Sequence, residues 1–287
     1  MKHLHTLNNT TIEVPGIGLG AMPLSLANHP DEQTAFNVID AFIDAGGRFI
    51  DTANVYCSDD HNVGHNERLL ARALNRRNDN EYILIATKGG LRRPKGDWTV
   101  DASPEWLRQS CEQSLRDLEI DSHFLYQLHA PDPKVPLTES VGELARLQSE
   151  GKIQHIGLSN VDVEQIRLAL SVTGIMSVQN RCNVFQRQAF TNGVIDFCAQ
   201  NQISFIAHSP VGGHFQHREL SANSTLVEIA AAHTATPYQV MLVWLLMKNP
   251  AIMTIPGATR VQSVIDSMAA LELELTTEEI ARIDRLA

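Results

Sequence analysis

The chain has no long apolar run and no excess of basic residues. Its longest uninterrupted apolar stretch, Val240 to Met247, is much shorter than the roughly 20 residues that span a bilayer. The N-terminus also lacks an apolar stretch of signal-peptide length, so we expect a cytoplasmic protein that is not membrane-bound. With 33 acidic and 23 basic residues, the formal net charge is −10. Nucleic acid is therefore not expected as a partner, because no basic surface is available to neutralise phosphates.

Cysteines and linkers are equally sparse. The four cysteines lie far apart and form no C-x-x-C pair, which argues against a zinc site or a redox motif. Cys111 and Cys198 fall on the apolar faces of helical patterns and are expected in the core, whereas Cys57 is expected to be exposed. No stretch rich in Pro, Gly or Ser divides the chain. We therefore expect residues 1–287 to form a single domain.

Apolar, strand-like runs alternate with helical patterns from one end of the chain to the other. Eight such runs indicate an α/β protein, and a single (β/α)8 TIM barrel is the favoured architecture. A doubly wound open sheet is the alternative, but no G-x-G-x-x-G joins a first strand to a helix. The segment Leu7–Val14 predicts an N-terminal β-hairpin that closes one mouth of the barrel, and extra helices are expected near 226–232 and 238–248. The strands are expected to end near Gly20, Asp51, Lys88, His129, Ser159, Gln179, His208 and Ile255.

Chemically distinctive residues follow several of these strands directly. Asp51, Lys88, His129 and Ser159 each come at or next to a predicted carboxyl end. The carboxyl ends of parallel barrel strands meet at one face, and barrel enzymes have their active sites there. The spacing therefore predicts a polar site at this face.

The order and spacing of the motifs resemble the aldo-keto reductase superfamily over essentially the whole chain. This resemblance implies a (β/α)8 barrel that reduces aldehydes or ketones with a nicotinamide cofactor, usually NADPH, bound without a Rossmann domain. The motifs are Gly18–Gly20, Phe49–Ala53 followed by Tyr56, Gly64–Leu70, Ala86–Lys88, Leu128–His129, Gly157–Asn160, Gln179–Asn180, Ser209–Gly212 and Ile255–Gly257.

The resemblance assigns catalytic roles to Asp51, Tyr56, Lys88 and His129. Tyr56 would be the general acid. The Lys88 ammonium would lower the pKa of the phenol from its usual value of about 10, and Asp51 would keep Lys88 protonated. His129 would hydrogen-bond the carbonyl oxygen of a small-molecule substrate. Met22, Tyr56, Trp98 and His129 are the predicted substrate-binding residues, although Trp98 could instead pack on its own loop.

The resemblance also places the cofactor. An NADPH preference over NADH is expected, because Arg260 can form a forked contact with the 2′-phosphate. His208 stands where an aromatic ring usually stacks on the nicotinamide; it is expected either to titrate near neutral pH or to be a packed neutral imidazole. The predicted cofactor-binding residues are Ala21, Met22, Asp51, Ser159, Asn160, Gln179, His208, Ser209, Pro210, Val211, Gly212, Gly257, Ala258, Thr259, Arg260 and Asp266.

Three other interpretations stay open. A metal site at His208, His214 and His217 is not expected, because their spacing is not a helical i, i+4 pair. A barrel metal hydrolase would account for the twelve histidines, but these are scattered. A non-catalytic NADP-binding regulatory or sensor protein would keep the same cofactor residues. The sequence leaves the physiological substrate and the oligomeric state open.

Overall fold

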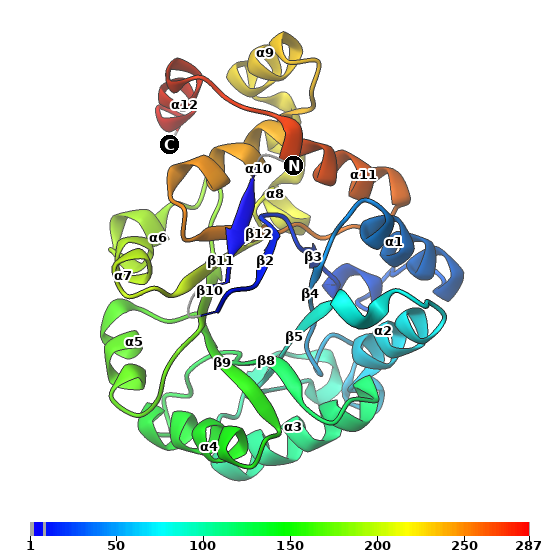
Figure 1. Cartoon of the computed structure of the whole chain (residues 1–287), viewed down its shortest axis with the longest axis vertical. Coiled ribbons are helices and arrows are strands. Elements are labelled where there is room, and N and C mark those ends of the chain that lie inside the picture. The colour runs from blue at the N-terminus through cyan, green and yellow to red at the C-terminus, as the bar shows by residue number, and fades with distance from the viewer. Residues whose placement is uncertain (1–2, 8–9, 287) are drawn as a thin grey trace.

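Eight parallel strands form the centre of the protein, and helices surround them (Figure 1). The computed structural model describes residues 3–7 and 10–286, except for the side chains of His214, Phe215, Arg218, Leu220 and Ser221. The strand order around the barrel is β12-β11-β10-β9-β8-β5-β4-β3. The bounds are β3 (Leu19–Gly20), β4 (Phe49–Asp51), β5 (Leu84–Gly89), β8 (His123–Leu128), β9 (Ile153–Ser159), β10 (Ser177–Arg181), β11 (Ser204–His208) and β12 (Ile252–Ile255).

The first and last strands meet and close the barrel. The Gly18 amide donates to the Thr254 carbonyl oxygen at 2.8 Å, and the Gly20 amide donates to the Pro256 carbonyl oxygen at 3.0 Å. Glycine is needed here because a Cβ on Gly18 would lie 2.7 Å from the Phe49 carbonyl oxygen, and one on Gly20 would lie 2.8 Å from that of Ile255. The expected (β/α)8 barrel is confirmed.

The helices begin at recognisable capping residues. Asp31, Ser103, Asp162 and Thr236 each accept a hydrogen bond from the third residue of the helix that follows, which satisfies one of its free amides. The α-helices are α1 (Glu32–Asp44), α2 (His65–Asn75), α3 (Pro104–Leu118), α4 (Leu137–Ser149), α5 (Val163–Leu170), α6 (Gln188–Thr191), α7 (Val194–Gln200), α8 (Gly213–Ala222), α9 (Ser224–Ala232), α10 (Pro237–Lys248), α11 (Val261–Ala269) and α12 (Thr277–Asp284). The short 3-10 turns are η1 (Met22–Leu24), η2 (Asp60–Asn62), η3 (Asn80–Tyr82), η4 (Pro94–Gly96) and η5 (Ala270–Glu272).

The extra helices lie where the sequence places them. The patterns at 226–232 and 238–248 become α9 and α10. A further helix, α8, comes after β11 and a short turn, in a segment with no helical prediction. Among the described residues, no helix combines the length and the apolar character that crossing a bilayer requires.

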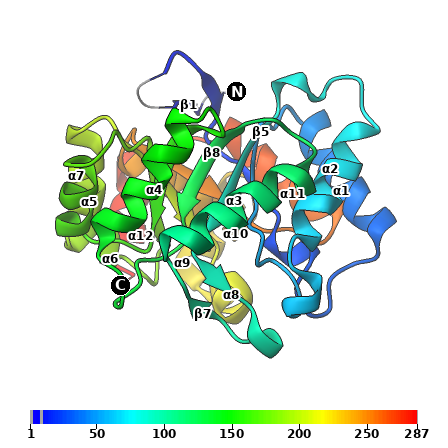
Figure 2. The ribbon, with the colours of Figure 1, turned by 90° about the horizontal axis from the view of Figure 1, so that it is seen from below.

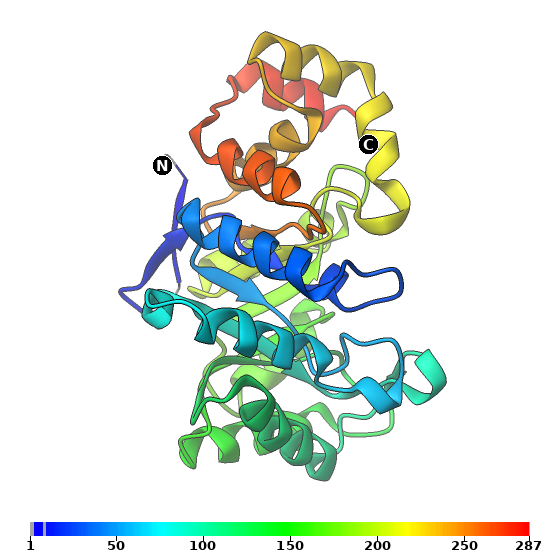
Figure 3. The same cartoon turned by 90° about the vertical axis from the view of Figure 1, so that its right-hand side faces the viewer.

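An N-terminal hairpin closes the amino end of the barrel. Strands β1 (Leu4–Thr6) and β2 (Glu13–Pro15) pair antiparallel, somewhat outside the expected limits. Leu7 and Val14 are buried against a barrel-interior cluster that includes Phe49, Leu125 and Met253. In Figure 2 the hairpin lies at the top of the molecule and β7 at the bottom; Figure 3 likewise shows the hairpin on one side and α8 on the other. The opposite mouth therefore carries the segments that follow the strands.

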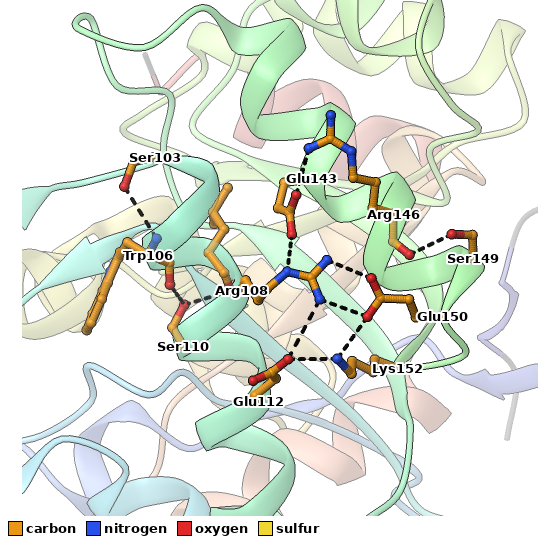
Figure 4. Close-up of polar contacts among 11 residues, drawn as sticks. Ser103, Trp106, Arg108, Ser110, Glu112, Glu143, Arg146, Ser149, Glu150 and Lys152 are labelled. Atoms are coloured by element: carbon orange, nitrogen blue, oxygen red, sulfur yellow. Dashed lines mark hydrogen bonds and ion pairs between the residues drawn. The ribbon is translucent and has the colours of Figure 1, made fainter.

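Charged residues join α3 to α4 on the outside of the barrel (Figure 4). The Arg108 guanidinium donates to Glu143 at 2.7 Å and to both oxygens of Glu150, at 2.7 and 2.8 Å. Lys152 bridges Glu150 and Glu112 at 2.8 and 2.7 Å. Exposed pairs of this kind contribute little individually. Arg108 thus links α3 to α4 through Glu143 and to the residue after α4 through Glu150.

The loop after β5 forms a second hairpin at the carboxyl mouth. Strands β6 (Leu91–Arg92) and β7 (Thr99–Val100) pair antiparallel, with η4 and Trp98 between them. The segment after Tyr56 folds beneath this hairpin, and Arg93 donates to the Cys57 carbonyl oxygen at 3.1 Å. The expectation that Cys57 is exposed is wrong, because this contact leaves it fully buried, like the other three cysteines.

Candidate active site

Asp51, Tyr56 and Lys88 meet at the carboxyl mouth of the barrel. Asp51 ends β4 and Lys88 lies one residue before the end of β5. The Lys88 ammonium donates to Asp51 Oδ2 at 2.6 Å, to the Thr52 carbonyl oxygen at 2.8 Å and to the Tyr56 hydroxyl oxygen at 2.9 Å. All three of its N–H groups are thus used. Because Tyr56 accepts this bond, its own proton stays free to be donated.

Burial and charge oppose each other at Lys88 and Tyr56. Burial alone would lower the pKa of Lys88, but the Asp51 carboxylate and the Tyr56 oxygen outweigh it, so the pKa is raised and the ammonium stays charged. The pKa of Tyr56 is also raised, because burial of the phenol outweighs the nearby ammonium. The expected lowering of the Tyr56 pKa is therefore wrong for the protein alone. The phenol keeps its proton at neutral pH.

His129 lies against Tyr56 and is neutral. Its ring centroid is 5.8 Å from that of Tyr56, in an edge-to-face arrangement. Burial, together with the charge of Lys88, lowers its pKa well below the usual range. Its Nδ1 is buried without a hydrogen-bond partner in the structure. A neutral imidazole offers one N–H donor, which is what is needed to orient a carbonyl oxygen.

Trp98 and Met22 are the exposed members of the predicted substrate set. The Trp98 ring lies 6.5 Å from Tyr56 and 6.4 Å from His129, both edge-on, and is 47% exposed. It also lies over the guanidinium of Arg93, on its own loop, at 3.9 Å. Trp98 thus packs on its own loop and also lies beside Tyr56 and His129, and its contact with substrate stays a prediction. Met22, on η1, is partly exposed.

Two amides hold the second oxygen of Asp51. Gln179 Nε2 donates to Asp51 Oδ1 at 2.7 Å, and Gln127 Nε2 donates to the same atom at 3.4 Å. Gln179 is buried and its Nε2 is engaged by Asp51, while its contact with a nicotinamide carboxamide stays a prediction. Gln127 was not predicted from the sequence as a site residue. Its position one residue before the end of β8, at the carboxyl mouth of the barrel, could have indicated it.

Ser159 and Asn160 lie at the end of β9, close to His129. Asn160 Nδ2 donates to the His129 carbonyl oxygen at 2.9 Å and to Ser159 Oγ at 3.1 Å. Asn160 has a φ of 58°, a left-handed value that asparagine tolerates better than most residues. The turn thereby places two polar side chains beside the proposed catalytic residues.

His208 ends β11 and is neutral. Burial, with smaller contributions from Arg181 and Lys88, lowers its pKa to about 3. The prediction that it titrates near neutral pH is therefore wrong for the protein alone, and the packed neutral imidazole is correct. Arg181, which pairs with His208 across β10 and β11, was missed in the sequence, because only strand register brings the two together.

The backbone after His208 turns sharply into a helix. Ser209, Gly212 and Gly213 have φ values of 52°, 86° and 61°, and α8 begins at Gly213. A Cβ on Gly212 would lie 2.9 Å from the Gln216 carbonyl carbon, so the turn needs glycine. Such a turn exposes backbone amides to an anion. Pro210 is buried and Val211 partly buried within it.

The segment after β12 offers a second set of anion-binding groups. Gly257, Thr259 and Arg260 are exposed, Ala258 is buried, and Arg260 immediately precedes α11. Asp266, on α11, accepts a hydrogen bond from Thr236 at 2.9 Å, and burial raises its pKa. Directly after β3, the Ala21 amide donates to the Asp51 carbonyl oxygen at 2.8 Å.

No cluster of three or more His, Cys, Asp or Glu side chains in the described part of the chain could hold a metal ion. The side chain of His214, one of the three histidines considered for a metal, lies outside the described residues. His217 instead hydrogen-bonds the Gly213 carbonyl oxygen of its own helix at 3.0 Å.

Comparison with known proteins places this barrel among carbonyl oxidoreductases. The model of the aldo/keto reductase family matches residues 16–287. "Probable aldo-keto reductase 1" of Glycine max is 31% identical, over 96% of this chain and 86% of that protein. A solved thermostable aldo-keto reductase in complex with the inhibitor epalrestat is 29% identical, with a TM-score of 0.85 over 99% of both chains. An aldo-keto reductase from Klebsiella pneumoniae in complex with NADPH is 28% identical, with a TM-score of 0.84 over 100% of this chain and 95% of that one.

The fold and these matches define an oxidoreductase of carbonyl compounds. The chain belongs to the aldo/keto reductase family and is an NAD(P)H-dependent enzyme. The resemblance drawn from the sequence motifs is thereby confirmed.

Proposed function

We propose that this enzyme reduces aldehydes or ketones to alcohols with NADPH, and that Tyr56 donates the proton to the carbonyl oxygen. The arrangement around Lys88 carries this proposal. Its ammonium gives a hydrogen bond to the Tyr56 oxygen at 2.9 Å and leaves the phenol proton unused within the described part of the chain. A positioned acid of this kind contributes about 10²–10⁴ to the rate.

The remaining residues prepare that proton transfer. As Tyr56 gives up its proton, negative charge develops on its oxygen, and Lys88 is already in place to stabilise it. Asp51 keeps Lys88 charged and is itself held by Gln179. The neutral His129 would donate a hydrogen bond to the substrate oxygen and aim it at Tyr56. Burial of this group strengthens each interaction, because little water screens it.

The residues around the mouth fit a nicotinamide dinucleotide. When bound, the reduced nicotinamide would supply the hydride. Ser159 and Asn160 would hold the nicotinamide end, with the neutral His208 beside it. The turn at 209–213 and the start of α8 would bind the pyrophosphate through backbone amides, and the exposed Arg260 would bind the 2′-phosphate. The NADPH of the Klebsiella pneumoniae relative supports this choice of cofactor.

The experiment is loss of the reduced-nicotinamide absorbance with a panel of aldehydes and ketones. Tyr56→Phe keeps the ring and removes only the hydroxyl, so we expect turnover to fall by roughly 10²–10⁴ while NADPH still binds. Tyr126→Phe is the matched control: Tyr126 is also buried, but its hydroxyl contacts Ser110 on α3. Turnover near that of the wild type in Tyr56→Phe would refute the role of Tyr56. Bound NADPH that no carbonyl compound oxidises would favour a regulatory or sensor protein instead.

A further inference from the structure

A buried arginine without an acidic partner lies beside the proposed proton donor. Arg93, between β6 and η4, is only 6% exposed. Its Nη2 donates to the carbonyl oxygens of Cys57 and Ser58, at 3.1 and 3.3 Å. Its Nε and Nη1 are buried and have no hydrogen-bond partner among the described residues. No carboxylate of the described residues is thus hydrogen-bonded to this guanidinium.

This arrangement is unfavourable for the protein alone. A guanidinium carries a positive charge and five N–H donors, and it has no acceptor. Burying a charge without a counter-charge is costly, and each unpaired N–H group adds to that cost. Two backbone carbonyls and one aromatic face compensate only in part. The neighbouring Arg92 shows the usual solution: it lies over Trp106 and also pairs with Asp101 at 2.6 Å.

Arg93 is connected to the substrate side of the site. Its guanidinium carbon lies 3.9 Å from the Trp98 ring centroid, and the Trp98 ring contacts Tyr56 and His129 edge-on. The Cys57 carbonyl that it binds belongs to the residue directly after Tyr56. A group on a carbonyl compound held at Tyr56 would therefore lie close to this charge.

The phosphates of the cofactor are badly placed to supply the missing anion. Arg93 follows β5, whereas the turn proposed to bind the pyrophosphate follows β11. In the strand order of the closed barrel, three strands separate β5 from β11 in either direction, so the two lie on opposite sides of the mouth. The substrate is the remaining source of negative charge.

We propose that Arg93 binds an anionic group of the substrate, so that the preferred substrates are aldehydes or ketones that also carry a carboxylate. The inference rests on the proposed reductase function. The Nε and Nη1 atoms are both covered in the structure, so the Trp98 ring or the η4 turn must shift to admit the anion. Within that turn, Lys95 is exposed and has a φ of 53°, a strained value for a residue with a side chain.

The test uses two aldehydes of nearly equal size. 4-Carboxybenzaldehyde carries the anion, and methyl 4-formylbenzoate is its neutral counterpart. We expect the wild type to have the higher kcat/KM for the anionic aldehyde. Arg93→Gln should reduce that preference by about tenfold or more, the range of one charge-assisted hydrogen bond. Arg93→Lys keeps the positive charge but loses the planar guanidinium that can donate two parallel hydrogen bonds. This variant should retain part of the preference for the anionic aldehyde. Arg92→Gln is the matched control and should leave the preference unchanged.

A second readout does not depend on turnover. Benzoate should bind the wild type in calorimetry and bind Arg93→Gln at least tenfold more weakly, while NADPH binds both proteins equally. Equal loss of kcat/KM for the two aldehydes in Arg93→Gln would mean that Arg93 only positions the loop, and would overturn the proposal. So would benzoate affinity that is unchanged by the substitution. These failures leave the reductase function intact, whereas a wild type that oxidises NADPH with no aldehyde or ketone of the panel would refute that function first.

Discussion

Substituting Asp51 by asparagine tests the charge balance on which the site depends. The Lys88 ammonium is completely buried, and Asp51 is the carboxylate that pairs with it, at 2.6 Å. The Asp51→Asn change would keep the size of the side chain and remove its charge. The hydrogen bonds of Lys88 to the Thr52 carbonyl and to Tyr56 would remain, but a buried cation would have lost its counter-charge.

The magnitude follows from this burial. Removing one partner of a buried ion pair lowers the free energy of unfolding by about 3–5 kcal/mol. We expect Asp51→Asn to show a loss of this size near pH 7. The pH dependence also changes sign. In the wild type the pKa of Lys88 is raised, so its stabilisation is fully present below the unfolded value of about 10.4 and is lost only above it. In Asp51→Asn burial prevails and the folded pKa drops below the unfolded one. The folded variant then binds fewer protons, and its free energy of unfolding rises with pH by up to about 1.4 kcal/mol per unit.

The assay is urea unfolding of both proteins between pH 7 and 9.5, together with NADPH oxidation. Glu228→Gln is the control, because Glu228 pairs with Arg282 at the surface and should contribute less than about 1 kcal/mol. We expect Asp51→Asn to be least stable relative to the wild type at pH 7 and to recover toward pH 9.5. Parallel pH curves, with a loss no larger than that of Glu228→Gln, would refute this account of Lys88.

Three further substitutions test separate parts of the structure. Arg260→Ala should weaken NADPH binding by about tenfold or more and leave NADH binding nearly unchanged. An unaltered NADPH/NADH preference would show that Arg260 does not bind the 2′-phosphate. His208→Phe should not change how the affinities for NADPH and NADP⁺ vary between pH 5.5 and 8, because His208 is already neutral there; a trend present only in the wild type would contradict its low pKa. Burial raises the pKa of Glu67 to about 7, so the wild type loses stability as pH rises from about 4.5 to 7. Glu67→Gln should therefore gain more than about 1 kcal/mol relative to the wild type between pH 5 and 8, measured by urea unfolding.

Much of the fold and the membership of the site could be predicted from local patterns. Apolar runs and helical periods gave eight strands whose ends the structure places within two residues of the prediction. The closure of the barrel was less visible, since it depends on the close approach of Gly18 and Gly20 to a strand more than 200 residues away. The helix α8 was missed because it begins with a glycine and has no apolar stripe of helical period.

The electrostatic state of the site was where prediction failed. The sequence indicated that Lys88 stands near Tyr56, and from this a lowered phenol pKa followed. The structure gives the opposite direction, because burial outweighs one ammonium. The same cause changes the interpretation of His208. Desolvation depends on every segment that covers a group, and no local pattern records that sum.

The sequence alone determined which chemical groups stand at the ends of parallel strands, and therefore that Asp51, Lys88 and His129 would meet at one face. It could do so because strand period and chain direction are local properties. Only the tertiary structure decided how deeply those groups are buried, which protons they keep, and that Arg93 comes to lie against Trp98 with no carboxylate of the described residues hydrogen-bonded to it. These outcomes depend on loops from β4 and β5 packing against each other, and that packing is set by contacts between residues far apart in the chain.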